Sequence, residues 1–192
     1  MDYQEIIHRR RALKIEPFKS LAEVGFDGPW VTPYQITSKS SEGPVLVALH
    51  WLDESSILRE RATLQNRGYL PDIRFNTVID TALARQGLSR SDIYVTQTFH
   101  LVPRTRSERI SQAAIRRSFD EVTRFELQGR KVIALGNIAA GECARHSIQH
   151  IAVCHPSRRG YTNEKNAAEI GDAIAALGFR GAVGDTGARD DR

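Results

Sequence analysis

The segment around His155 carries the clearest chemical signal, because an apolar run, Ile151–Cys154, leads directly into His155-Pro156-Ser157. Pro156 fixes its own φ angle and favours an extended conformation for the residue before it. A histidine held in this way can donate a hydrogen bond to an oxygen that gains negative charge in a transition state. The alternative is a His-Pro turn without a catalytic task, and an isolated His-Pro-Ser step favours that alternative.

A second candidate segment, 92–106, joins a short β-branched run to the basic stretch Pro103-Arg104-Thr105-Arg106. Gln97 offers a carbonyl acceptor and an amide donor together, a pair that can read the Watson–Crick edge of a base. Thr105 and Glu108 fit a capping box, which predicts a helix over 105–127. Arg104 and Arg106 would then lie at its start, where the helix dipole favours phosphate. The plainer interpretation is a loop glutamine followed by a capped surface helix.

Strands and helices must alternate from residue 44 onward to position these segments. Apolar runs predict strands over 45–49, 93–96, 131–135 and 151–154, and helical periodicity predicts helices over 73–86, 105–127, 138–146 and 163–177. This order predicts an α/β fold, a three-layer α/β/α sandwich with a four-stranded parallel sheet. Ligands of such sheets bind beyond the carboxyl ends of the strands. The site is therefore expected among residues 50–56, 97–106, 136–137 and 155–161.

The remaining residues are expected to flank this domain, which spans 44–179. Residues 1–43 form an N-terminal extension packed on the core, with helices predicted over Glu5–Leu13 and Phe18–Val24 and an irregular stretch that Trp30 and Tyr34 pin to the core. Residues 180–192 are rich in glycine and aspartate, and we expect a flexible tail.

Three segments, taken together and in order, resemble the uracil-DNA glycosylase superfamily, especially its thermophile-type branch. They are VTQTFHLVPRTR at 95–106, VIALGNIAA at 132–140 and CHPSRRG at 154–160. The resemblance covers residues 44–177 and implies a uracil-DNA glycosylase-like fold. It also implies the activity, in which an enzyme flips a base out of DNA and hydrolyses the bond between base and sugar.

The first strand departs from the family pattern. In the family it runs into a Gly-x-Asp-Pro or Gly-x-Ala-Pro loop, whereas here it leads into His50-Trp51-Leu52-Asp53. Trp51 occupies the aligned acid position, so Asp53 or Glu54 from further along the loop would supply the acid, or His50 would hold the attacking water instead. Gln97 replaces the family's base-reading asparagine and is longer by one methylene. The two cysteines exclude the iron–sulfur ligands found in part of that branch.

The resemblance also assigns roles to the other candidate residues. His155 would stabilise the departing base anion, and Gln97 would orient the base. Trp51 would belong to the base pocket, and either Phe75 or Phe99 would supply the aromatic face on which the base stacks. Contacts to the DNA backbone would come from a basic and polar set: Arg104, Arg106, Ser157, Arg158 and Arg159.

Composition bounds the class of protein. The 192 residues are 41% hydrophobic and 26% charged, which excludes disordered, collagen-like and coiled-coil chains. Apolar runs are far shorter than the ~20 residues of a membrane span, and the start of the sequence, MDYQEIIHRRR, carries acids and lacks the apolar region of a signal peptide. We therefore expect a soluble, cytoplasmic protein, a monomer without membrane contact. Lys and Arg total 27 against 23 Asp and Glu, and the clustered arginines suit DNA as the partner.

No metal or cofactor is expected. Cys143 and Cys154 lie in apolar surroundings and read as small core residues. A site combining Cys154 with His146, His150 and His155 is conceivable, but the spacing matches no zinc pattern.

Several functions stay open at this point. A monofunctional DNA glycosylase has uracil as its default base, in DNA repair by base excision. A bulky modified cytosine, such as glucosylated hydroxymethylcytosine in phage DNA, would instead fit a defence role, by analogy alone. A non-catalytic nucleic-acid-binding module on the same fold is the second class. A hydrolase or nucleotide-binding protein is the third, and the sequence has no G-x-G-x-x-G, P-loop or G-x-S-x-G motif to favour it.

Overall fold

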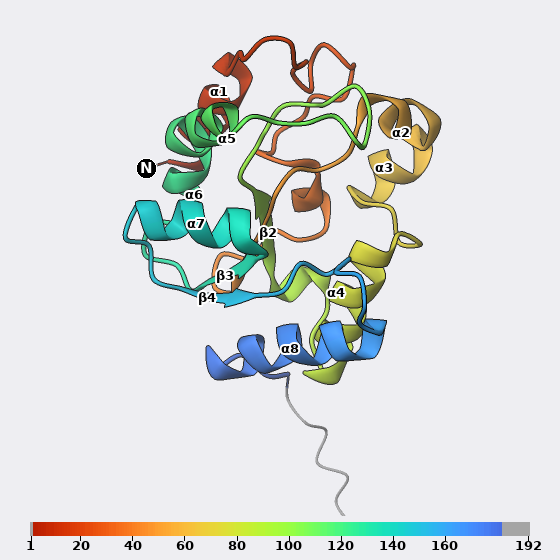
Figure 1. Cartoon of the computed structure of the whole chain (residues 1–192), viewed down its shortest axis with the longest axis vertical. Helices are drawn as coiled ribbons and strands as arrows, with labels where there is room; N and C mark the ends of the chain where they lie inside the picture. Colours follow the sequence, from red (N-terminus) through yellow and green to blue (C-terminus); the bar gives the residue numbers. More distant parts are fainter. Residues whose placement is uncertain (1, 182–192) are drawn as a thin grey trace, which may run out of the picture.

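A four-stranded parallel sheet lies at the centre of the computed structural model, which describes residues 2–181 (Figure 1). Its strands are β1 (Val45–Ala48), β2 (Tyr94–Gln97), β3 (Val132–Leu135) and β4 (His150–Val153). They pair in the order β2-β1-β3-β4, with Ala48 opposite Gln97 and Leu135 opposite Val153. The predicted strands are confirmed to within one residue, and so is the α/β sandwich. Apolar runs without alternation are typical of strands that are buried on both faces.

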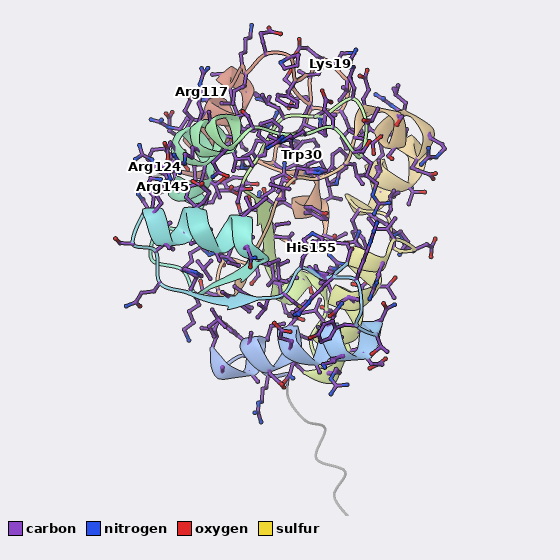
Figure 2. All side chains as sticks on the ribbon, viewed as in Figure 1. Lys19, Trp30, Arg117, Arg124, Arg145 and His155 are labelled. Carbon is purple, nitrogen blue, oxygen red and sulfur yellow. The ribbon has the colours of Figure 1, made fainter. Side chains whose placement is uncertain are left out.

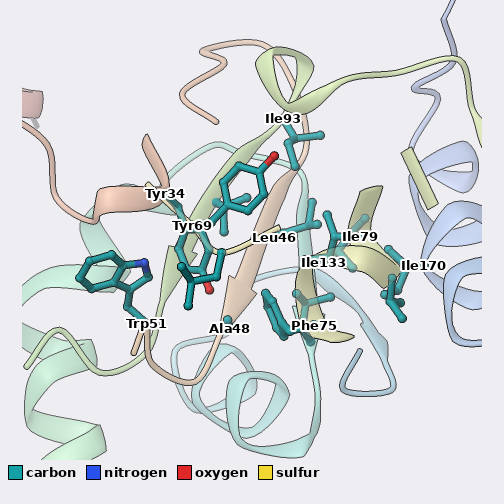
Figure 3. Close-up of a cluster of buried hydrophobic side chains, with 14 of the residues drawn as sticks. Tyr34, Leu46, Ala48, Trp51, Tyr69, Phe75, Ile79, Ile93, Ile133 and Ile170 are labelled. Atoms are coloured by element: carbon teal, nitrogen blue, oxygen red, sulfur yellow. The ribbon is translucent and has the colours of Figure 1, made fainter. Parts of the chain in front are cut away.

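Side chains alternate between the two faces of the sheet, and a different set of helices covers each face. Leu46 and its neighbours pack against α4 (Arg74–Arg85) and α8 (Asn163–Ala176). Val47 and its neighbours pack against α7 (Asn137–Arg145) and the segment around Phe119. In Figure 1, α7 and α8 lie on opposite sides of the sheet. Figure 3 shows the larger of the two cores, which includes aromatic residues from outside the sheet.

The remaining elements are short. They are α1 (Tyr3–Ala12), the 3₁₀ turns η1 (Pro33–Ile36) and η2 (Arg90–Asp92), α2 (Glu54–Arg59), α3 (Arg61–Arg67), α5 (Gln112–Ser118), the π-helical turn η3 (Phe119–Thr123) and α6 (Arg124–Glu126). The predicted helices over 5–13, 73–86, 138–146 and 163–177 correspond to α1, α4, α7 and α8. The sequence analysis did not predict α2 and α3.

The helix predicted over 105–127 is wrong in its first third. The Glu108 carboxylate accepts the backbone N–H of Arg104, and the Glu108 N–H donates to the Thr105 carbonyl, which closes a turn instead of starting a helix. The helix begins only after Ser111, whose hydroxyl accepts the N–H of Ala114. Arg104 and Arg106 therefore lie in a loop and not at a helix start, so no helix dipole supports phosphate binding there.

The N-terminal segment is built into the core and along the edge of the sheet. Trp30 and Tyr34 are buried in the larger core. Ser38 and Ser40 form backbone hydrogen bonds with Val95 and Ile93, so this segment covers the open edge of β2. The helix predicted over 18–24 is wrong, because the chain forms a bridge from Lys19 to Val102 and then turns. The domain boundary at 43/44 stays a prediction, and nearly all of the predicted tail, 180–192, lies outside the described residues.

Candidate active site

A cavity of about 240 Å³ opens beyond the carboxyl ends of β1 and β4. Seven of the twelve candidate residues line it: His50, Trp51, Asp53, Phe75, Arg106, His155 and Ser157. They come from the loop after β1, the start of α4, the loop after β2 and the loop after β4. The prediction that the site lies beyond the carboxyl ends of the strands therefore fits the cavity.

His155 lines the cavity, and its side chain is exposed. Figure 2 marks its place in the fold. Its Nδ1 accepts the backbone N–H of Ser157 at 3.1 Å, and its ring centroid lies 5.5 Å from that of Phe75. Partial burial of the ring and the Arg106 guanidinium lower the pKa of His155. The ring is therefore neutral near pH 7 and carries its proton on Nε2. The side chain can donate one hydrogen bond from a fixed ring.

Gly136 supports His155 from the next strand. Its φ of +97° is a conformation that side chains with a Cβ rarely adopt, and an added Cβ would lie 3.3 Å from the His155 Cβ. The Gly136 N–H donates to the Val153 carbonyl at 2.9 Å, which ties the ends of β3 and β4 together. The strand-glycine-helix step in the sequence thus positions the loop that carries His155.

His50 and Asp53 lie together in the loop after β1. Burial lowers the pKa of His50, and the nearby His155 and Arg106 add to that effect while Asp53 opposes it. The Asp53 carboxylate caps α2 by accepting the Ser56 N–H, and it also accepts the hydroxyl groups of Ser55 and Ser56. Burial raises the pKa of Asp53, but these hydrogen bonds outweigh it and hold the pKa below its usual value. Asp53 is therefore ionised at neutral pH.

The two aromatic candidates that line the cavity differ in how they are held. Phe75, at the start of α4, faces His155 across the wall. The Trp51 indole N–H donates to the Gly68 carbonyl at 2.8 Å, and its ring packs 5.1 Å from that of Phe26. The indole N–H is thus occupied within the protein, and Trp51 contributes only its ring to the wall.

Gln97 and Phe99 do not line the cavity, contrary to expectation. Gln97 is 1% exposed, and its amide oxygen accepts the Thr32 hydroxyl at 3.3 Å. Phe99 is fully buried and packs edge-on against Phe18, with ring centroids 4.9 Å apart. The physical reason is that the N-terminal segment covers the end of β2, so the residues that follow this strand point into a packed interior.

A buried polar network continues from Gln97 and has Glu126 at its centre. The Glu126 carboxylate is sealed from solvent and accepts hydrogen bonds from Gln35 at 3.0 Å and from Tyr94 and Thr96 at 2.5 Å each. Burial raises its pKa to about 7 although these three donors oppose the rise. His100 lies 3.6 Å from the same carboxylate, and burial lowers its pKa to about 3. The sequence analysis identified neither Glu126 nor His100.

The basic candidates are spread over three surfaces. Arg106 lines the cavity, whereas Arg104 lines a neighbouring open groove with Glu54 and Leu58. Arg158 lines a hollow on the far side of His155, where its guanidinium lies 4.0 Å from the centre of the Tyr161 ring. Arg159 is exposed. The four arginines thus surround the loops at the carboxyl edge rather than form one cluster.

Sequence reasoning missed two polar residues that line the cavity, Tyr34 and Arg59. Arg59 lies on α2, the helix that Asp53 caps, and an Asp-Glu-Ser-Ser run is a recognisable helix start. Tyr34 lies before the first strand, and no spacing pattern connects it to the strand ends.

No metal site accompanies these residues. Across residues 2–181, no group of three or more His, Cys, Asp and Glu side chains is arranged to hold a metal ion. Cys143 is buried, and the Cys154 thiol donates a hydrogen bond to the Asn166 amide oxygen at 3.5 Å. Among the same residues, no helix is long and apolar enough to cross a membrane.

The fold is that of an α/β protein with a cavity at the carboxyl edge of a parallel sheet, and His50, His155 and Arg106 line that cavity. The family model for the uracil DNA glycosylase superfamily matches residues 60–178, from the end of α2 to the end of α8. The chain therefore belongs to the uracil-DNA glycosylase superfamily, as its motifs predict, and its general chemistry is that of a DNA glycosylase. A comparison with curated proteins finds no match. The thermophile-type branch stays a prediction.

Proposed function

We propose that this chain is a monofunctional DNA glycosylase that flips a pyrimidine, uracil by default, out of DNA and hydrolyses its N-glycosidic bond. The observation that carries the proposal is His155, a neutral ring with Nδ1 occupied by the Ser157 N–H and Nε2 free to donate into a cavity. A fixed donor of this kind stabilises the charge that develops on a leaving base more than it stabilises the bound substrate.

The cavity has room for one base. Its volume of about 240 Å³ exceeds the ~150 Å³ of a cavity that holds benzene, so a pyrimidine with its exocyclic atoms fits. Phe75 offers the aromatic wall for stacking, and it is preferred over Phe99 because Phe99 is sealed away. Uracil remains the default, and the extra space supports testing substituted cytosines beside it.

The reaction follows from this arrangement. The bond between C1′ of the sugar and N1 of the base breaks, its electron pair stays on the base, and the sugar becomes oxocarbenium-like. His155 Nε2–H donates to the base oxygen that gains the charge. Water then adds to C1′, and its proton passes to the departed base anion through solvent, which leaves an abasic site and the neutral free base. Base release requires no covalent bond to the protein and no metal.

Asp53 and His50 are the proposed residues for holding that water. Asp53 already accepts three hydrogen bonds from Ser55 and Ser56, and an ionised carboxylate has about four acceptor positions. One position therefore remains for a water in the cavity. His50 borders the same space.

The arginines are the proposed contacts to phosphate. Arg106 lies at the cavity, and Arg104, Arg158 and Arg159 extend the basic surface along the loops on either side. Ser157 would reach the backbone of the flipped nucleotide. Loss of one such contact is expected to weaken binding to every DNA sequence and to reduce its salt dependence.

A base panel tests the function. The protein is incubated with DNA that carries a single uracil, hypoxanthine, 5-hydroxymethylcytosine or glucosylated 5-hydroxymethylcytosine, and alkali then converts abasic sites into breaks. We expect breaks at uracil, and a rate of break formation that is ~10²–10³ lower with the His155→Ala variant. Breaks only at the glucosylated base would shift the role from repair to defence against phage. Binding of DNA without release of any base would leave the non-catalytic module as the function.

A further inference from the structure

We infer that Tyr34 binds the edge of the extruded base and thereby helps to decide which base is accepted. Tyr34 lies outside the region that the family model matches, residues 60–178, so the N-terminal segment would complete the base pocket. This inference rests on the proposed glycosylase function and adds a specificity-determining residue to it.

Tyr34 reaches the cavity from a turn of the N-terminal segment. It lies on η1, is 2% exposed, and lines the cavity that also contains His155. Figure 3 shows Tyr34 and Phe75 in the same core. The Tyr34 ring centroid is 6.3 Å from that of Phe75, which in turn is 5.5 Å from that of His155. Tyr34 and His155 therefore flank the same aromatic side chain.

The Tyr34 hydroxyl is free to bind a ligand. It makes no hydrogen bond with any residue from 2 to 181, and it is not one of the sealed polar atoms that lack a partner in that part of the chain. The oxygen must therefore touch open space, and the cavity is the space that Tyr34 lines. Burial raises the pKa of Tyr34, so the hydroxyl keeps its proton at neutral pH.

The turn that carries Tyr34 is held firmly. Gln35 accepts the Val31 N–H and donates to Glu126, each at 3.0 Å, and the Thr37 hydroxyl donates to the Arg67 carbonyl at 2.9 Å. The last two bonds fix the turn to α6 in the interior and to the end of α3 at the surface. A side chain positioned in this way loses little freedom when a ligand binds, which favours selective recognition.

A phenol O–H matches an exocyclic oxygen of a base. The Tyr34 hydroxyl can donate a hydrogen bond to a carbonyl oxygen such as those of uracil. With a hydroxyl group on a base substituent, it can either donate or accept the hydrogen bond. A base that lacks an oxygen there would leave a buried hydroxyl without a partner. Tyr34 therefore favours bases that present oxygen to this side of the cavity.

The test compares Tyr34→Phe with Tyr69→Phe. Tyr69 is a second buried tyrosine of the same core that does not line the cavity, so its variant reports on loss of a buried hydroxyl alone. We expect Tyr34→Phe to lower the single-turnover rate on the accepted base about 10-fold and to leave affinity for abasic DNA and the melting temperature unchanged. Tyr69→Phe should retain the rate.

Two outcomes would overturn the inference. One is a Tyr34→Phe protein that releases every base at the wild-type rate, and the other is a loss of rate matched by equal loss of stability. If the wild-type protein releases no base, the proposed function fails separately. In that case, the inference is tested by DNA affinity. Tyr34→Phe should bind uracil-containing DNA more weakly than the wild-type protein does, and should bind the same DNA with an abasic site as tightly as wild type. If the variant matches wild type on both DNAs, the inference is overturned.

Discussion

The ends of β4 and β2 contain similar residues in opposite surroundings. Each strand leads into polar side chains and a histidine, His155 after β4 and His100 after β2. His155 lines an open cavity and keeps one ring nitrogen free, whereas His100 is 1% exposed and bonds with Thr123. Burial lowers the pKa of both histidines, but only His155 is accessible to a ligand.

The difference comes from what covers each strand end. The N-terminal segment and the helical region from α5 to α6 cover the end of β2, where Gln35 and Glu126 hold the polar groups in place. The end of β4 is flanked instead by loops and the first turn of α4. A polar residue after a strand therefore marks a site only where the strand end stays uncovered.

The largest expected effect on activity concerns His155, at the uncovered end of β4. His155→Ala should lower single-turnover base release by ~10²–10³, because it removes a donor aimed at developing charge. Affinity for DNA should change only a few-fold. A thermal melt provides the control, and a variant that melts like wild type and releases base at full rate would remove His155 from the mechanism.

A change at the covered end of β2 should instead lower stability and leave the rate of base release unchanged. Glu126→Ala leaves Gln35, Tyr94 and Thr96 without their shared acceptor, so the free energy of unfolding should fall by about 3 kcal/mol. The melting temperature should drop by roughly 6–12 °C, while the rate per folded molecule stays near wild type. A reduced rate in a protein of normal stability would show that this network also serves the chemistry.

A comparison of Gly136 with Gly129 separates backbone strain from the positioning of His155. Gly136 and Gly129 both have positive φ, +97° and +70°, but only a Cβ at Gly136 would press on His155. Gly129→Ala should lose about 1–2 kcal/mol of stability, and Gly136→Ala should lose about 1–3 kcal/mol, because a φ of 97° with a ψ of 168° is adopted almost only by glycine. Gly136→Ala should in addition lose about 10-fold in rate, because small displacements of a catalytic group are costly. Equal rates in the two variants would argue against support of His155 by this contact.

The smallest effect is a shift in pH dependence. The neutral His155 ring accepts the Ser157 N–H, and protonation of Nδ1 would break that bond, so the rate should fall as pH decreases through its lowered pKa, below ~6.5. Arg106 helps to lower this pKa. Arg106→Gln should therefore raise it and move the acid limb of the single-turnover profile to higher pH, by less than about one unit. Saturating protein keeps weaker DNA binding out of the measurement, and an unmoved limb would contradict the coupling.

Much of the fold could be predicted from periodicity alone, because buried parallel strands and amphipathic helices leave strong local patterns. The boundaries of β1 to β4 and of α4, α7 and α8 show this. The start of α5 could not be predicted, because Thr105 and Glu108 match the capping-box pattern but form a turn. Arg61–Arg67 has a single buried residue, Leu64, so α3 left no apolar stripe to detect.

The site was only partly predictable for a related reason. His155 and the loop that contains His50 and Asp53 could be located from motifs and strand order, whereas the sequence left the choice between Phe75 and Phe99 open. Gln97 and Phe99 lie outside the cavity, and Tyr34 lines it without having been predicted, because the positions of all three depend on where the N-terminal segment docks. That docking is set by contacts over long sequence distances, such as Thr32 with Gln97.

The same long-range contacts set an order for folding during synthesis. Gln35 and its partner Glu126 are separated by 91 positions. At ~5–20 residues per second, the ribosome needs roughly 5–20 s to add the acceptor after the donor has been made. Until then, the aromatic residues Phe26, Trp30 and Tyr34 have no complete core to enter. This segment, which is made before the elements it packs against, is thus among the last to reach its final place.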